Sequence, residues 1–321
     1  MIWKAPAVSV FLAVGLLLQA MPGARAAAPG ENDRRWPRRT IPYAICDCSN
    51  GDPKPLCSKF QCLSKETVNT AQDAITGWNK MAEKVLKFTP RDPKNDTAPY
   101  VLFISQESST SKDAFNNEDK CASYGDVGWS GTNDPKIILI PDGCLFAKDK
   151  TGKLIKRSAA SVMGTMMHEM GHAVGLNHEQ QRTDRDKYIV VKFTGNTANK
   201  QISQSGRMCA SDNEENCEFQ SRTFFRQYTH GRDVGEYDFG SVMHYPLNPG
   251  ILKTPEETAN LWKEVCTKAD DLKTACIGLK KDGFERLKVQ QLDINSIADR
   301  TRGLSSLDVE ALDKYYQGIQ F

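Results

Sequence analysis

The stretch HEMGHAVGLNHEQQRTDRD spans residues 168–186 and holds three of the five histidines in this 321-residue chain. His168 and His172 are four residues apart in a segment that we expect to be helical. They should therefore lie about 40° apart around the helix axis and about 6 Å apart along it, so both imidazoles can reach one point beside the helix. Gly175 tolerates positive φ, so the helix can end there and the chain can turn to bring His178 to the same point.

Three neutral imidazoles around one point suit a zinc ion, which binds histidine nitrogen at about 2.0–2.1 Å. Three protein ligands leave one coordination position open, which is typical of a catalytic rather than a structural zinc site. Glu169 can then take the proton of a zinc-activated water and later protonate a leaving amine. The alternative is a surface helix with incidental histidines, but the spacing to Gly175 and His178 favours the zinc site.

Hydrophobic periodicity predicts the elements around this stretch. Strands are expected over three apolar runs, at Ile41–Cys46, Tyr100–Ser105 and Lys136–Pro141. Helices are expected to begin at Ser64, at Ser158 and at Ser305, the last with Ser305 as N-cap and Asp308 at its third position. From Phe193 to Gly303 the pattern is weak, and we expect irregular structure there.

The stretch also resembles a known family. H-E-x-x-H-x-x-G-x-x-H marks the metzincin zinc peptidases, which carry a downstream Met-turn, and Ser241–Tyr245 (SVMHY) is similar to that turn. Glu179 after the third histidine and the approach Tyr237–Ser241 resemble the astacin family. The resemblance runs from about Trp36 to Tyr316. Further similarities lie at Trp36, Ile41–Tyr43, Phe88–Arg91, Cys121–Tyr124, Arg182, Asp184–Asp186 and Leu304–Ser305.

This resemblance implies an α+β fold, a metzincin or zincin-like catalytic domain over residues 27–321. An N-terminal subdomain, about 27–178, would hold a twisted mixed sheet with helices. An irregular C-terminal subdomain, about 179–321, would close a cleft with zinc at its floor. Substrate would lie extended and pair with an edge strand near Cys121 to Tyr124.

By the same resemblance His168, His172 and His178 bind one zinc ion per subunit, and Glu169 is the general base. Tyr245 is implied as an extra ligand that swings off the metal and helps to stabilise the oxyanion, a transition-state-selective interaction.

Other roles are implied by the family as well. Met243 should pack beneath the zinc without binding it, and Glu179 should make a water-mediated contact with the buried mature amino terminus. A Cys121–Cys144 disulfide is implied. His244 is expected to be structural, and His230 is expected at the surface.

The chain also departs from the family pattern. It lacks the F-x-G-D propeptide segment, so we expect signal cleavage near Ala26 to create the mature terminus directly. Val85 stands where the family has the first cysteine of a bridge to the C-terminus. We also expect a catalytic domain without EGF-like or CUB modules.

The amino-terminal residues predict export. Lys4, the apolar run Ala7–Leu18 and the small-x-small site Ala24–Ala26 are typical of a signal peptide at residues 1–26. The alternative, a membrane anchor, needs a longer apolar run. Ten cysteines in an exported chain indicate disulfides. Two local bridges are favoured over a zinc knot for the first group, which comprises Cys46, Cys48, Cys57 and Cys62.

Charge gives no case for nucleic acid or an anionic membrane as partner. The whole chain has 42 basic and 40 acidic residues, and residues 1–26 contribute only Lys4 and Arg25 to these numbers. The run Arg34–Arg39 (RRWPRR) is expected to be a solvated segment, with a dibasic processing site as the alternative.

The sequence therefore predicts a secreted, monomeric zinc endopeptidase that acts on extended protein or peptide substrates. A catalytically inactive secreted binding protein on the same scaffold is the alternative. Astacins often favour an acidic residue just after the scissile bond, for which Lys253 or Arg182 could supply the basic group. Asn95 is a possible glycosylation site.

Overall fold

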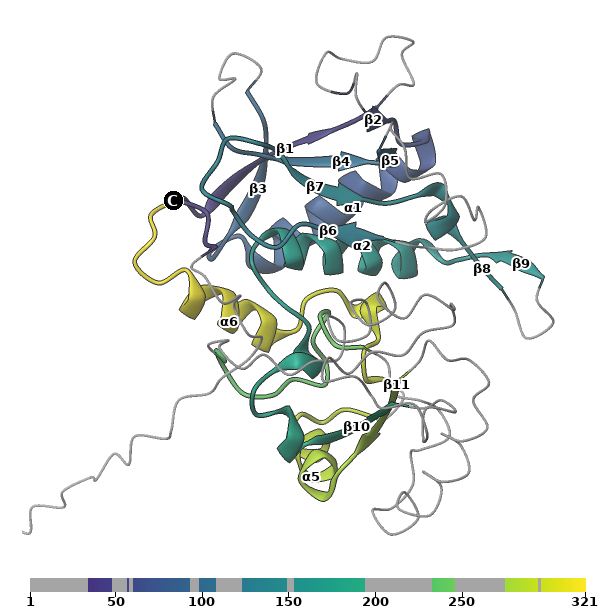
Figure 1. Ribbon diagram of the computed structural model, residues 1–321, viewed down its shortest axis with the longest axis vertical. Coiled ribbons are helices and arrows are strands. Elements are labelled where there is room, and N and C mark those ends of the chain that lie inside the picture. Colours follow the sequence, from purple (N-terminus) through teal and green to yellow (C-terminus); the bar gives the residue numbers. More distant parts are fainter. Residues whose placement is uncertain are drawn as a thin grey trace, which may run out of the picture.

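A five-stranded mixed sheet packed against two long helices forms the upper part of the molecule (Figure 1). The computed structural model describes residues 34–47, 57, 60–92, 98–107, 123–148, 153–193, 233–245, 275–293 and 296–321. The strand order is β3-β1-β4-β7-β6, with bounds β1 (Thr40–Ile45), β3 (Lys87–Pro90), β4 (Val101–Ile104), β6 (Tyr124–Gly125) and β7 (Lys136–Leu139). The predicted strands are thus confirmed, and so is the α+β class.

The edge of this sheet differs from its interior. β1, β3, β4 and β7 pair in parallel, whereas β6 runs antiparallel to β7 with Tyr124 opposite Leu139 and Gly125 opposite Ile138. β4 is buried along its whole length, as its unbroken apolar run VLFI requires. The edge strand therefore includes Tyr124, where the resemblance predicted it, while Cys121 lies outside the described residues.

The two long helices begin at the predicted caps. The side chain of Ser64 accepts a hydrogen bond at the start of α1 (Lys65–Ala82), and the side chain of Ser158 does so at the start of α2 (Ala159–Ala173). Their apolar faces and one face of the sheet bury a single core that includes Ile41, Trp78 and Met166. The opposite face of the sheet has its own smaller buried cluster, which includes Leu102 and Cys57.

The lower part of the molecule has more regular structure than predicted. β10 (Ile189–Phe193) pairs antiparallel with β11 (Ala275–Leu279), and α5 (Lys281–Val289) follows directly. The prediction of irregular structure between Phe193 and Gly303 is wrong for β11 and α5. α5 has only 9 residues and begins after Lys280 without a side-chain cap, so its sequence lacks the start signal that marks the other helices.

The remaining described elements are short. α6 (Ser306–Tyr315) begins with the predicted capping box between Ser305 and Asp308. The others are β2 (Phe60–Gln61) with β5 (Gln106–Glu107), β8 (Phe146–Lys148) with β9 (Leu154–Lys156), and the 3-10 turns η2 (Asp142–Leu145), η3 (Glu179–Gln181), η4 (Arg185–Lys187) and η8 (Arg300–Arg302). Within the described residues, no helix has the length and hydropathy that a membrane span requires.

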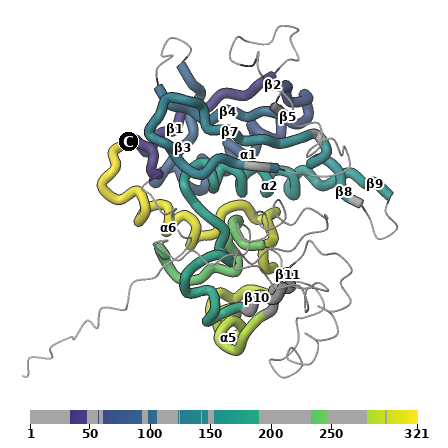
Figure 2. Tube along the Cα trace, in the orientation of Figure 1, coloured from purple at the N-terminus to yellow at the C-terminus, as the bar shows by residue number. Residues whose placement is uncertain are grey.

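The C-terminal end of the chain lies beside the start of β1 (Figure 2). Arg39 makes this connection, because its guanidinium donates to the carbonyl oxygens of Tyr316 at 2.9 Å, Ile319 at 3.0 Å and Val85 at 3.4 Å. The prediction of a solvated basic run is therefore wrong for Arg39, which ties together the two regions that the missing family bridge would join.

The cysteines follow the oxidised pattern. Cys46 and Cys57 form a disulfide, and Cys62 and Cys144 are also disulfide-bonded. Cys121, the predicted partner of Cys144, lies outside the described residues, so that pairing stays a prediction. Cys48, Asn95 and His230, which were also named from the sequence, lie outside them too.

Candidate metal centre

Helix α2 and the turn after it bring the three histidines of the opening stretch together. The helix ends in a Schellman motif, in which the Gly175 amide donates to the His172 carbonyl and the Leu176 amide to the Gly171 carbonyl. Gly175 has φ +98°, which places it in the left-handed region that favours glycine. The turn thereby directs His178 back towards the helix.

The three imidazoles converge through their Nε2 atoms. Nε2 of His178 lies 3.1 Å from Nε2 of His172 and 3.2 Å from Nε2 of His168. Each Nδ1 lies 2.8 Å from an acceptor, namely the Val242 carbonyl for His168, the Leu176 carbonyl for His172 and Gln181 Oε1 for His178. The Nδ1 atoms are therefore the protonated ones, and three Nε2 lone pairs point at one another.

This donor set fits a tetrahedral zinc ion. Bonds of about 2.0–2.1 Å in tetrahedral geometry separate two ligand atoms by about 3.3 Å, close to the separations found here. Burial and nearby positive charge lower the pKa values of all three histidines, that of His172 to about 4, so they are neutral and able to bind metal. Among the described residues, His168, His172 and His178 are the group of side chains whose arrangement could hold a metal ion.

Glu169 lies buried beside the histidines, with 3% of its surface exposed. Burial raises the pKa of its carboxyl to about 7, while a hydrogen bond from Ser123 and the charge of Arg300 act in the opposite direction. Ser123 directly precedes the edge strand β6, so the edge of the sheet touches the carboxylate. Sequence reasoning missed this contact because Ser123 and Glu169 are far apart in the chain.

The second motif, SVMHY, lies against the histidines. Met243 is buried and packs on Gly171, and a Cβ added to Gly171 would collide with the Met243 sulfur. The ring of Tyr245 lies 4.4 Å from the ring of His178 and 6.2 Å from that of His168, measured between centroids. The structure thus brings both residues to the site, and their implied roles stay predictions.

Arg300 is a site residue that sequence reasoning missed. Its Nη2 lies 3.4 Å from Nε2 of His168, and its guanidinium lies 5.8 Å from the centre of the Tyr245 ring. The turn η8 can approach α2 this closely because position 164 is glycine, where a Cβ would overlap the Arg300 carbonyl. No local pattern marks such a residue, since it is 132 positions from His168.

Glu179 and Arg182 form a separate buried pair behind the histidines. Glu179 Oε1 accepts from the Asp238 amide at 2.7 Å and lies 3.5 Å from the Arg182 guanidinium, which also bonds Asp184. Burial raises the pKa of Glu179 to about 8, with Arg182 acting in the opposite direction. Arg182 is fully buried in these contacts, so it is not placed to meet a substrate. Lys253, the other candidate, lies outside the described residues.

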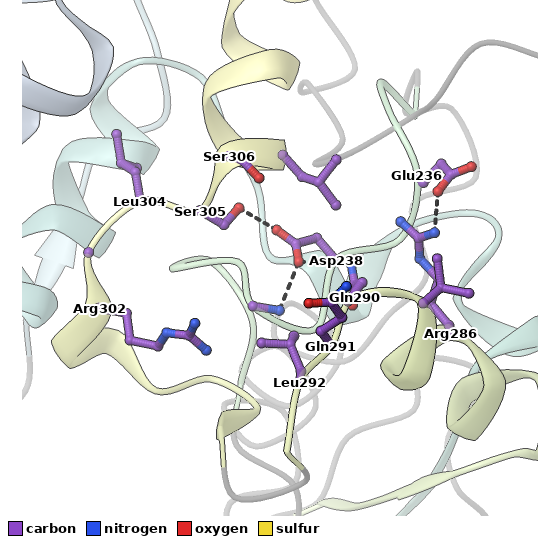
Figure 3. Close-up of a pocket in the computed structure, with 14 residues that line it drawn as sticks. Glu236, Asp238, Arg286, Gln290, Gln291, Leu292, Arg302, Leu304, Ser305 and Ser306 are labelled. Atoms are coloured by element: carbon purple, nitrogen blue, oxygen red, sulfur yellow. Dashed lines mark hydrogen bonds and ion pairs between the residues drawn. The ribbon is translucent and has the colours of Figure 1, made fainter.

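A cavity of about 620 Å³ lies apart from the histidines, between α5 and the start of α6 (Figure 3). Asp238 faces it and is held by Ser305 and Gln290, while Arg286 is paired with Glu236. These polar groups are satisfied by one another, and the three histidines do not line the cavity.

Comparison with known proteins gives consistent matches. The family model described as Astacin, a family of peptidases, matches residues 29–280. Over 215 residues the chain is 29% identical to Blastula protease 10 of Paracentrotus lividus, a match covering 66% of this chain and 25% of that protein. It is 30% identical to Protein SpAN of Strongylocentrotus purpuratus, with 66% and 24% covered. The chain thus spans about a quarter of the length of these curated relatives.

Solved structures include a similar protein as well. High choriolytic enzyme 1, a hatching enzyme zinc-protease from Oryzias latipes, aligns with a TM-score of 0.43 and 18% identity, covering 86% of this chain and 88% of that one.

Proposed function

Since the chain belongs to the astacin family of peptidases, we propose that it is a zinc-dependent endopeptidase that hydrolyses peptide bonds of protein substrates. The observation that carries this proposal is the convergence of three buried, neutral imidazoles with a buried carboxylate beside them. Three protein ligands leave a coordination position open for water, so this arrangement suits metal-assisted hydrolysis better than structural metal binding.

His168, His172 and His178 would hold the zinc ion through Nε2. A bound zinc ion supplies Lewis-acid chemistry, which activates water near neutral pH and polarises the scissile carbonyl. Glu169 takes the proton of the attacking water and passes it to the leaving amine. Its burial beside the histidines supports this role, because the carboxylate is held at the place where the water would bind.

Tyr245 is proposed to stabilise the developing oxyanion. Its ring lies close to His178, and its backbone amide donates to Gln180 Oε1 at 3.0 Å, which anchors the main chain beside the histidines. A phenol that donates a hydrogen bond only as negative charge develops lowers the transition state selectively. The implied role of Tyr245 as a metal ligand before substrate binds is part of this proposal.

The substrate is proposed to pair with the edge strand β6. Gly125 supports this placement, because a Cβ there would lie 2.6 Å from the Glu169 carbonyl oxygen and 3.2 Å from its Oε2. Glycine thus lets the edge strand lie directly against α2. An extended peptide added to this edge would run past Glu169.

Arg300 is proposed as the basic group that favours an acidic residue just after the scissile bond. It is half-buried, lies beside His168 and Tyr245, and carries the positive charge that such a pocket needs. Arg182, by contrast, is fully buried against Glu179 and Asp184.

The protein is proposed to be secreted and monomeric, with residues 27–321 as the mature peptidase domain. The disulfide between Cys46 and Cys57 supports an oxidising compartment. Glu179 is proposed to receive the mature amino terminus through water, and its Oε2 has no hydrogen-bond partner among the described residues. Residues 1–33 lie outside the described part, so this contact rests on the resemblance.

Casein cleavage by the purified protein tests the proposal against the alternative of an inactive binding protein. We expect cleavage that 1,10-phenanthroline abolishes, that added zinc restores, and that is lost in Glu169→Ala. A matched control, Glu310→Ala in α6, should retain full activity. Folded, zinc-loaded protein without cleavage would favour the inactive alternative, and unchanged activity in Glu169→Ala would overturn the mechanism.

A further inference from the structure

The three metal-facing histidines are not held in the same way. His168 and His172 each direct Nδ1 at a backbone carbonyl, of Val242 and Leu176 respectively. His178 alone directs its Nδ1 at a side chain, Gln181 Oε1, at 2.8 Å. Substitutions can remove a side-chain acceptor but not a backbone carbonyl, so His178 is the ligand whose orientation depends on the identity of another residue.

Gln181 is itself fixed in place. Its side chain is buried, with 1% of the residue exposed. Its backbone N–H donates to the His178 carbonyl at 3.0 Å in the turn η3. The preceding residue Gln180 is buried as well and accepts from the amide of Tyr245. The two consecutive glutamines therefore contact different parts of the site: Gln181 bonds the imidazole of His178, and Gln180 bonds the backbone of Tyr245.

We propose that Gln181 is a positioning residue for zinc, which acts by fixing the ring and the tautomer of His178. An imidazole that binds metal through Nε2 must carry its proton on Nδ1, and a buried Nδ1–H needs an acceptor. Gln181 Oε1 supplies that acceptor and so keeps the Nε2 lone pair directed at the metal position. This inference rests on the proposed zinc site.

The chemistry of the acceptor sets the expected effects. Loss of such an outer contact lowers metal affinity by about 10–100-fold. Methionine at position 181 has a similar length and no strong acceptor, so the Nδ1–H loses its partner. Glutamate keeps an oxygen in the same place and adds charge, which makes the histidine a better donor to the metal.

The experiment measures zinc affinity rather than turnover. Metal-free parent protein, Gln181→Met and Gln181→Glu are titrated with zinc against a fluorescent chelator, and the visible spectrum of the Co²⁺ form is recorded. Gln290→Met is the control, because it removes a part-buried side-chain amide contact, to Asp238, away from the histidines. Thermal melting of the metal-free forms reports folding independently.

We expect Gln181→Met to bind zinc about 10–100-fold more weakly with an altered Co²⁺ spectrum, and Gln181→Glu to match or exceed the parent. Gln290→Met should bind zinc within about twofold of the parent. Folded Gln181→Met with parental affinity would overturn the inference. If Gln181→Met does not fold, a folded Gln181→Glu that binds about 10-fold more weakly than the parent would overturn it as well. Failure of the parent to bind one zinc ion would instead defeat the proposed function.

Discussion

The carboxylate of Asp308 accepts a hydrogen bond from the amide of Val242 at 3.0 Å, across 66 positions of the chain. The same carboxylate accepts from the Ser241 hydroxyl at 2.6 Å and from the Ser305 amide at 3.0 Å. The Val242 carbonyl in turn receives Nδ1 of His168. The aspartate of the α6 capping box therefore also holds the turn at Ser241 and Val242, whose carbonyl orients one of the three convergent histidines.

Asp308→Ala tests this link. Removing the carboxylate leaves three donors without their partner in the interior, each worth about 1–3 kcal/mol. We expect the free energy of unfolding to fall by at least about 3 kcal/mol, measured by urea denaturation. Glu310→Ala, at the solvent-facing side of the same helix, should change it by less than about 0.5 kcal/mol. Equal effects of the two variants would refute the link.

The pH dependence of stability gives a second test of Asp308. Burial, and then the neighbouring charge of Asp238, raise its pKa to about 7, against about 3.9 for an unfolded aspartate. The folded state therefore binds the extra proton, so this contribution to stability is complete below about pH 4 and is lost as the pH rises through about 7.

Asp308→Asn removes the group at position 308 that titrates in this window and leaves the other buried carboxyls in place. We expect the parent to lose stability relative to Asp308→Asn between about pH 4 and 7, at up to about 1.4 kcal/mol per pH unit. Urea denaturation at several pH values measures this difference, with the exposed Asp73→Asn as control. Parallel pH profiles for the parent and Asp308→Asn would contradict the assignment.

Tyr245→Phe removes a hydroxyl and leaves the ring beside His178. If the phenol stabilises the oxyanion, kcat should fall about 100-fold or more with little change in KM. Steady-state kinetics on a quenched-fluorescence peptide provide the measurement. Tyr188→Phe is the control, since Tyr188 stacks on Tyr237 away from the histidines. A variant with unchanged kcat would exclude this role.

Arg300→Ala should change the preference for the residue just after the scissile bond while the protein stays folded. A charge-assisted hydrogen bond of about 1.5–3 kcal/mol corresponds to a factor of about 10–150 in kcat/KM. We expect a loss of that size for peptides with aspartate just after the scissile bond, and a much smaller loss for alanine there. Arg302→Ala, an exposed residue in the same turn η8, should leave the ratio unchanged. The same ratio in both variants would argue against Arg300.

Arg39→Met should loosen the connection between β1 and the C-terminal end. The guanidinium bonds two carbonyls there and pairs with Asp313 at 2.7 Å, with only 11% of the arginine side chain exposed. Its loss should lower the free energy of unfolding by about 1.5–3 kcal/mol in thermal or urea denaturation. The exposed neighbour Arg38→Met should have an effect below about 0.5 kcal/mol. If both variants lost similar free energies of unfolding, the hydrogen bonds of Arg39 would contribute nothing specific to stability.

Local patterns gave good predictions where the physics is local. The starts of α1, α2 and α6 depend on a serine cap and a 3.6-residue apolar period within a few residues of chain. Helix α5 is not predicted because it is short and begins after Lys280 without a side-chain cap. The prediction for the basic run is wrong at Arg39 because its carbonyl acceptors include Ile319, at the far end of the chain.

The sequence by itself determined which residues face the metal position, because the i, i+4 spacing of His168 and His172 and the turn at Gly175 act within a single helix and its cap. Only the tertiary structure decided which carbonyl accepts from His168 and which cation lies beside that histidine, whereas the acceptors of His172 and His178 lie within four residues of them. Val242 and Arg300 reach His168 across 74 and 132 positions, and contacts over such separations depend on how helices and turns pack rather than on any local pattern.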